Sequence, residues 1–245
     1  MSARIAIPIL LSVLLLSGAH VFGSFDYYRF VVEWPGSICK DVNGPGCCRP
    51  TTGNPKEDFH VKALYTYSGS QPITKCNTTK FDVNLVSSIS EELNEYWPTI
   101  KCPSNNGHTT WNDAWRLYGV CTGLGQKDYF KTALKLRSKI NLFSLFKRNG
   151  IVPSVIDSYD FVLVKNTIRG GIGASAAIEC TMNEWGEHQM TDIHICVARD
   201  GTTIIQCPTL PKFKCDTLVS YPIFTFDMLK ETSMSTNPIK MSVSE

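Results

Sequence analysis

The sequence predicts a single α+β domain with a central antiparallel β-sheet flanked by several helices. Strand-like runs occur toward both ends of the chain, and helical patterns lie between them without the regular βαβ alternation of parallel sheets. Short turns such as Arg199-Asp200-Gly201 join the later runs, as expected for antiparallel strands. Ten cysteines in 245 residues indicate a disulfide-bonded fold.

The first part of the chain contains two β-rich runs and one helical pattern. YYRFVVEW (27–34) and FHVKALYT (59–66) are rich in aromatic and β-branched residues and are predicted strands. The segment 81–97 is a predicted helix because its apolar residues recur at helical spacing. These residues are Leu85, Ile89, Leu93 and Trp97.

Further helices are predicted in the middle of the chain. One begins near Thr110, where Thr110-x-x-Asp113 resembles a capping box. The span 127–147 has helical patterns on both sides of a break near Asn141.

The last predicted helix is 158–169, ended by Gly170-Gly171. Three strand-like runs follow it. They are AAIECTM (176–182), TDIHICVA (191–198) and TTIIQCP (202–208).

The N-terminal segment has the layout of a secretory signal peptide. Arg4 precedes an apolar run, Ile5–Leu16, that is too short to span a bilayer. Small residues follow, and Val21 and Gly23 suit positions −3 and −1 of a cleavage site. The mature chain is therefore expected to start at Ser24.

Three regions are expected along the chain: a signal peptide over 1–23, one domain over 24–215, and a C-terminal extension over 216–245. The extension contains no cysteine, and its polar end is expected to be partly disordered. The roughly 220 residues after the signal peptide are enough for one sizeable core.

All cysteines follow the predicted cleavage site, and their even number in a secreted chain favours five disulfides. Zinc binding by cysteines is the alternative, but the chain lacks a paired CxxC motif. No metal site and no cofactor are predicted.

The charge argues against a polyanion-binding surface. The net charge of +2 falls to +1 when Arg4 is removed with the signal peptide. Asn77-Thr78-Thr79 is the only N-x-[ST] sequon, so Asn77 is a predicted glycosylation site.

Several motifs together resemble plant members of the ribonuclease T2 family, which include S-like and self-incompatibility ribonucleases. The motifs occur in the family's order and cover nearly the whole mature chain to about Cys215. They are FVVEWPGSICK (30–40), the CC of GCCRP, YWPTIKCP (96–103), TWNDAWRLYGVC (110–121) and YFKTALKLRSKINLFSLFKRNGI (129–151).

The resemblance implies RNA cleavage by transphosphorylation, in which one group takes the 2′-hydroxyl proton and another protonates the leaving oxygen. Family enzymes use a histidine in the strand motif F-T-I-H-G-L-W-P. The helix motif F-W-x-H-E-W-x-K-H-G-T-C supplies two further histidines, a glutamate and a lysine.

This chain departs from the family pattern at these positions. Lys62 replaces the strand histidine, and Tyr65 replaces the tryptophan of that motif. In the helix motif Trp111, Trp115, Gly119 and Cys121 match the family. At the other positions this chain has Asp113 and Ala114 in place of the family's histidine and glutamate. It has Leu117 in place of the lysine and Tyr118 in place of the second histidine. We therefore predict no catalytic residues.

Two histidines are candidates to replace the missing catalytic histidines, and one carboxylate affects RNA binding. His60 lies two residues before Lys62 and would face the same side of a strand, displaced by roughly 6–7 Å. His108 precedes the predicted helix by two residues and is a second candidate to approach the cleft. Each is more simply an ordinary core or surface histidine. Glu33 stands where related enzymes commonly show glutamine, and its negative charge disfavours RNA.

The resemblance also implies the disulfide pairing. The implied pairs are Cys39–Cys47, Cys48–Cys102, Cys76–Cys121, Cys180–Cys215 and Cys196–Cys207.

The resulting prediction is a catalytically inactive homologue of the secretory pathway, in the vacuole or apoplast, serving as a vegetative storage protein. The alternatives are an RNA-, nucleotide- or partner-binding module and a weak endoribonuclease making 2′,3′-cyclic phosphates. In a binding module Trp111 and Trp115 would offer stacking faces for bases, but the favoured interpretation is that both pack the helix against the sheet. A monomer is expected, with weak or absent RNA binding and no certain partner. The strand 59–66 and the helix Thr110–Tyr118 should face each other across a cleft, with Lys62 and Asp113 on the same side of the molecule.

Overall fold

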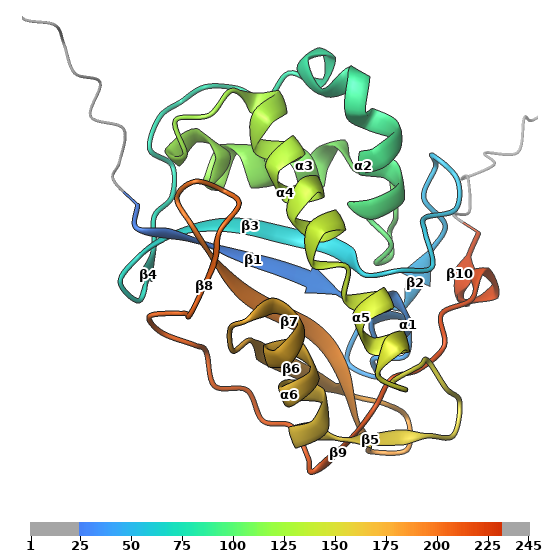
Figure 1. Cartoon of the computed structure of the whole chain (residues 1–245). Coiled ribbons are helices and arrows are strands. Elements are labelled where there is room, and N and C mark those ends of the chain that lie inside the picture. Colours follow the sequence, from blue (N-terminus) through green and yellow to red (C-terminus); the bar gives the residue numbers. More distant parts are fainter. Residues whose placement is uncertain (1–24, 232–245) are drawn as a thin grey trace, which may run out of the picture.

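The computed structural model describes residues 25–231, and its centre is a twisted, mainly antiparallel sheet (Figure 1). The strands follow the order β4-β3-β1-β7-β9-β5, and β6 and β8 also pair with β7. One parallel bridge, Gln189 to Ser220, joins β7 to β9. The predicted α+β fold with a central antiparallel sheet is therefore confirmed.

The three central strands are long and the others are short. The central strands are β1 (Tyr27–Glu33), β3 (His60–Ser68) and β7 (His188–Ala198). Their neighbours are β4 (Gln71–Pro72), β5 (Ser158–Asp160), β6 (Ala177–Met182), β8 (Ile204–Ile205) and β9 (Leu218–Ser220). A small parallel pair joins β2 (Cys47–Cys48) to β10 (Leu229–Lys230).

Helices lie between the early and late strands, as the sequence predicts. They are α1 (Pro35–Cys39), α2 (Ser90–Tyr96), α3 (His108–Leu117), α4 (Gln126–Ile140), α5 (Leu142–Arg148) and α6 (Phe161–Ile172). Short 3-10 helices are η1 (Val83–Ile89), η2 (Gly119–Cys121) and η3 (Phe226–Met228).

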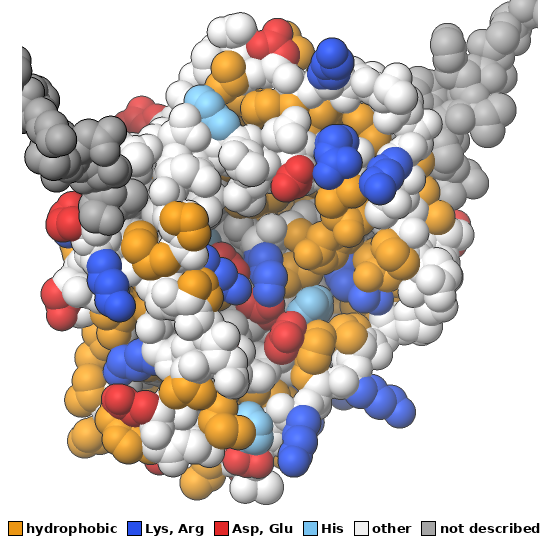
Figure 2. Space-filling view, turned by 180° about the vertical axis from the view of Figure 1, so that it is seen from behind, with side chains coloured by type: hydrophobic (Ala, Val, Ile, Leu, Met, Phe, Trp, Pro, Cys, Tyr) orange, Lys and Arg blue, Asp and Glu red, His pale blue; other side chains and the backbone are white. Residues whose placement is uncertain are grey.

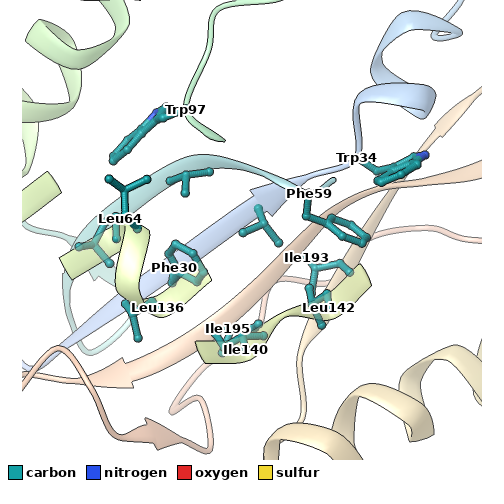
Figure 3. Packing of buried hydrophobic residues seen from close by; sticks show 14 of the residues in the cluster. Phe30, Trp34, Phe59, Leu64, Trp97, Leu136, Ile140, Leu142, Ile193 and Ile195 are labelled. Atoms are coloured by element: carbon teal, nitrogen blue, oxygen red, sulfur yellow. The ribbon is translucent and has the colours of Figure 1, made fainter. Parts of the chain in front are cut away.

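The main core lies between one face of the sheet and the helices α4 and α5 (Figure 3). Phe30 of β1 and Ile193 of β7 are fully buried there, against Leu136 of α4. Burying each such side chain contributes about 1.5–3 kcal/mol. Since side chains alternate along a strand, Asp192, His194 and Cys196 of β7 lie on the opposite face.

Five disulfides cross-link the domain, and their pairing is the one that the resemblance implies. The longest loop, closed by Cys48–Cys102, ties β2 to the segment before α3. Cys76–Cys121 ties the chain after β4 to the end of the helix motif. Such bridges typically stabilise a fold by about 2–4 kcal/mol each.

The segment 81–97 is not one α-helix. Its first half is the 3-10 helix η1, in which neighbours on one face are three residues apart. Val86 is therefore fully buried, whereas Leu85 is 55% exposed. The α-helix α2 begins only at Ser90, and its Leu93 is buried as predicted.

The start of α3 and the bounds of α6 also differ from the prediction. α3 begins at His108 after Gly107, and no side chain caps it, so the capping box at Thr110 is wrong. Residues 158–160 form strand β5, and α6 begins after Asp160, which caps it at Leu163 N–H. The helix continues through Gly170-Gly171 and ends at Gly173, whose φ of 76° suits a glycine cap.

Two smaller predictions have opposite outcomes. The break near Asn141 is confirmed: Asn141 has a φ of 41° and separates α4 from α5. The predicted strand 202–208 is too long: only Ile204–Ile205 pairs with β7, as strand β8, and Cys207 is tied to Cys196 of β7 by a disulfide.

The packed chain continues beyond Cys215, the expected end of the domain. β9 joins the sheet, Tyr221 is 1% exposed, and β10 pairs with β2. The expected extension thus contributes core and sheet residues up to Lys230. The expected signal peptide (1–23) and the last part of the extension (232–245) lie outside the described residues.

Candidate functional site

The strand motif and the helix motif meet at a small pocket, which we call the motif cleft. Its volume is about 180 Å³. The lining residues are Glu33, Val61, Lys62, Trp97, Pro98, Thr99, Ile100, Lys101 and Thr110. Lys62 comes from β3 and Thr110 from α3, so the two motifs share one cleft as predicted.

A second contact joins the same two motifs. The rings of Tyr65 on β3 and Tyr118 after α3 pack edge to face, with centroids 4.6 Å apart. Burial, with a further contribution from Tyr118, raises the pKa of Tyr65 to about 12. Burial also raises the pKa of Tyr118. Neither phenol is therefore suited to transfer a proton near neutral pH.

The other replaced positions of the helix motif do not line the motif cleft. Asp113 has a half-exposed side chain and pairs with Arg116 at 3.4 Å. Ala114 packs against the core. Leu117 uses its carbonyl oxygen to accept a hydrogen bond from the Lys75 N–H at 2.8 Å.

Lys62 is held by a buried carboxylate that the sequence analysis missed. Its Nζ forms an ion pair with Asp192 Oδ2 of β7, and the Asp192 side chain is 1% exposed. Burial of Lys62 is the largest single influence and alone would lower its pKa, but the charge and the hydrogen bond of Asp192, together with the charges of Glu33 and Glu179, outweigh it, and the pKa of Lys62 is raised. The ammonium form is thus stabilised, so Lys62 is a poor proton acceptor.

Glu33 lies directly opposite Asp192 in the pairing of β1 with β7. It is 8% exposed. Burial and the negative charge of Asp192 raise the pKa of Glu33 to about 7. Glu33 is the one acidic residue that lines the motif cleft, beside Lys62 and Lys101, and Asp192 pairs with Lys62. The face of Figure 2 shows acidic, basic and histidine side chains gathered around a hollow.

The retained tryptophans belong to the core. Trp111 is 0% and Trp115 is 4% exposed. Their indole N–H groups donate to Trp97 O at 2.9 Å and Thr79 O at 3.2 Å. A side chain on Gly119 would place its Cβ 2.2 Å from Trp115, so this glycine permits the close packing. The interpretation of both tryptophans as stacking faces for bases is wrong, because neither presents a free ring face.

His60 does not substitute for the missing strand histidine. It is 0% exposed, and its Nε2 lies 2.8 Å from Lys56 O, to which it donates. A bulge also leaves Lys62 without a partner in β1, which breaks the strict alternation that would place both side chains on one face. His108 is the first residue of α3, lies beside Asn106 and Trp111, and does not line the motif cleft.

The burial of His60 predicts an acid-sensitive stability. Burial lowers its pKa from 6.5 to about 4. Because the unfolded chain binds this proton more readily, stability is fully present above pH 6.5 and is lost as the pH falls toward 4, by about 3 kcal/mol. His60→Gln should remove this part of the pH dependence in urea unfolding between pH 7 and 4. His108→Gln should keep it; equal slopes in wild type and His60→Gln would contradict the assignment.

A larger pocket of about 480 Å³ lies on the other side of α3. Its lining residues are Lys75, Asn77, Thr78, Thr79, Lys80, Phe81, Asn112 and Arg116. Asn77, the predicted glycosylation site, is exposed, and its Nδ2 donates to Val120 O at 2.9 Å. Glycosylation of Asn77 remains a prediction.

The fold and the cleft together define a class of protein: a disulfide-bonded α+β domain whose cleft is formed by a strand motif and a helix motif. Within this class, the chain belongs to the ribonuclease T2 family, whose model matches residues 25–207. The sequence resemblance is thereby confirmed. No helix within residues 25–231 is long and apolar enough to cross a membrane.

Named relatives include both ribonucleases and a storage protein. The chain is 35% identical to the extracellular ribonuclease LE of Solanum lycopersicum, over 85% of this chain and 92% of that protein. It is 30% identical to a ribonuclease-like storage protein of Panax ginseng, over 78% and 80% of the two chains. The crystal structure of RNase NT in complex with 5′-AMP has a TM-score of 0.78 and 33% identity, covering 82% of this chain and all of the other.

Proposed function

We propose that this protein is a catalytically inactive member of the ribonuclease T2 family. The observation that supports the proposal most directly is the ion pair between Lys62 and Asp192. At the position where the resemblance implies a proton-transferring histidine, the chain has an ammonium group held by a buried carboxylate. None of the nine residues that line the motif cleft is a histidine.

The other replacements remove the groups that would assist the reaction. Ala114 and Leu117 carry neither a proton nor a charge for the phosphorane. Asp113 pairs with Arg116 outside the motif cleft and supplies no imidazole. Tyr118 keeps its proton near neutral pH. Since each general acid or base contributes on the order of 10²–10⁴-fold, the loss of several should leave little activity.

The decisive experiment is a ribonuclease assay on the purified mature chain, beside tomato ribonuclease LE as an active relative. We expect cleavage at least about 10⁴-fold slower than that of the relative. Several relatives at 33–36% identity are named ribonucleases, so the assay tests the proposal directly against the activity that these names indicate. Cleavage at a comparable rate, copurifying with the protein through two different columns, would refute the proposal.

We further propose a storage role, in the vacuole or the apoplast. It is supported by the ginseng relative named a ribonuclease-like storage protein and by five disulfides, which suit an oxidising compartment. A monomer that accumulates in one tissue and declines when growth resumes is the expected behaviour. Constant low abundance through that cycle would count against storage.

A binding module is the second candidate. The pocket of about 480 Å³ carries Lys75, Lys80 and Arg116, which would favour an anionic ligand such as a nucleotide. Equilibrium binding of 5′-AMP and of a short single-stranded RNA distinguishes the two candidates. We expect weak or absent binding of both, and micromolar affinity would favour the binding module.

A further inference from the structure

Two neighbouring strands bring together three metal-binding side chains outside the replaced catalytic positions. Glu179 lies on β6, and Asp192 and His194 lie on β7. Glu179 pairs with Asp192 in the register of the two strands, and Ala177 pairs with His194. One potential ligand atom from each of the three side chains lies within 4.8 Å of the others.

The hydrogen bonding of this group is incomplete. Asp192 is 1% exposed, and although its Oδ2 pairs with Lys62, its Oδ1 has no hydrogen-bond partner among the described residues. His194 is 8% exposed, and neither ring nitrogen makes a hydrogen bond within the described chain. Its Nε2 lies 3.5 Å from Glu179 Oε2. Buried polar atoms without partners are costly, so such a group commonly binds something.

The local charge also favours a cation. Asp192 faces Glu33 on one side, in β1, and Glu179 on the other, in β6. Three carboxyl groups therefore converge on this part of the sheet. Lys62 makes the ion pair with Asp192, and Lys101 acts on Glu33 from a greater distance. A divalent cation between Glu179, Asp192 and His194 would offset the remaining acidic charge.

We propose that Glu179, Asp192 and His194 bind one Zn²⁺ ion, with Asp192 using Oδ1 while Oδ2 keeps its pairing with Lys62. One imidazole and two carboxylates suit zinc, which takes nitrogen and oxygen ligands at about 2.0–2.2 Å. Glu179 provides the access route, because its side chain is 37% exposed and can rotate to close the site. The Phe213 ring packs 5.0 Å from the His194 ring and limits its motion.

The ion would link β6 to β7 and would add to stability by binding only the folded chain. The site is independent of the proposed loss of ribonuclease activity, so either proposal can fail without the other.

The test is equilibrium dialysis of ZnCl₂ against the untagged, oxidised mature protein. No cysteine within residues 25–231 is free, so thiolates do not compete for the metal. We expect one zinc per chain, with His194→Gln and Glu179→Gln each weakening binding at least tenfold. The matched control is His188→Gln on the same strand, since His188 pairs with Asp216 at 2.6 Å and lies outside the group. This variant should bind like the wild type.

A second measurement needs no substitution. Cobalt(II) added to the wild-type chain should give the intense visible absorption of a tetrahedral site, which ZnCl₂ abolishes and CaCl₂ does not. The proposal is overturned by the absence of saturable zinc binding. It is equally overturned by zinc binding that His194→Gln leaves unchanged, by an equal loss in His188→Gln, or by cobalt absorption of octahedral intensity.

Discussion

Lys62→Met is expected to lower the free energy of unfolding by about 3–5 kcal/mol, measured by urea denaturation with EDTA present. The substitution keeps most of the side-chain stem but removes the ammonium group that pairs with Asp192. Removing one partner of a buried ion pair leaves the other charge uncompensated, which is strongly destabilising. The Asp192 side chain is 1% exposed, although that of Lys62 is 35% exposed, so the burden of the lost partner falls on the buried carboxylate.

Lys56→Met is the matched control for this prediction. Lys56 pairs with Glu95 at 2.8 Å, but their side chains are 50% and 31% exposed. Such a pair contributes only about 0–1 kcal/mol. Adding Asp192→Leu to Lys62→Met should recover most of the stability, because an apolar pair of similar size replaces the ion pair. If Lys62→Met and Lys56→Met lower the free energy of unfolding equally, the pair of Lys62 with Asp192 contributes no more to stability than the exposed pair, and the prediction is wrong.

The main strands and helices follow from local patterns in the sequence. The aromatic and β-branched runs of β1 and β3 favour strands, and the apolar spacing in α4 favours a helix. The 3-10 helix η1 could not be predicted in this way, since its apolar residues also fit a helix of 3.6 residues per turn.

Strands β5 and β9 depend on contacts between distant segments. Ser158–Asp160 has no apolar alternation, and it becomes a strand because Tyr159 pairs with Val219. The same pairing explains why the chain after Cys215 belongs to the domain. Sequence composition indicated only that the end of this region is polar.

The replaced catalytic positions could be predicted from motif resemblance, but their new partners could not. Lys62 and Asp192 are 130 residues apart and meet only because β3 and β7 flank β1 in the sheet. A signal was present in TDIHICVA, where Asp192 and His194 alternate with Ile193 and Ile195. This alternation indicated a polar face behind the core, although the carboxylates facing it from β1 and β6 required the strand order.

The second large effect concerns restored catalysis. Lys62→His with Tyr118→His places imidazoles at two of the positions that the family uses for proton transfer, yet this double variant should stay nearly inactive. Asp113, Ala114 and Leu117 would still give the transition state no imidazole, no general acid and no positive charge. Catalytic groups that act as a unit are non-additive, so part of the set recovers little.

Adding Asp113→His, Ala114→Glu and Leu117→Lys to these two changes should raise RNA cleavage at least about 10²-fold above the double variant, because the restored groups can then act together. The measurement is release of a 2′,3′-cyclic phosphate product from a labelled oligonucleotide.

The control carries the other four changes with Lys62→Ala, and it should lose the gain. Two features of the fold limit the gain in RNA cleavage. Tyr118→His breaks the ring contact with Tyr65, and Asp192 remains beside position 62. Cleavage by the five-change variant that is no faster than that of its Lys62→Ala control would mean that the walls of the motif cleft, and not only its proton carriers, have been lost.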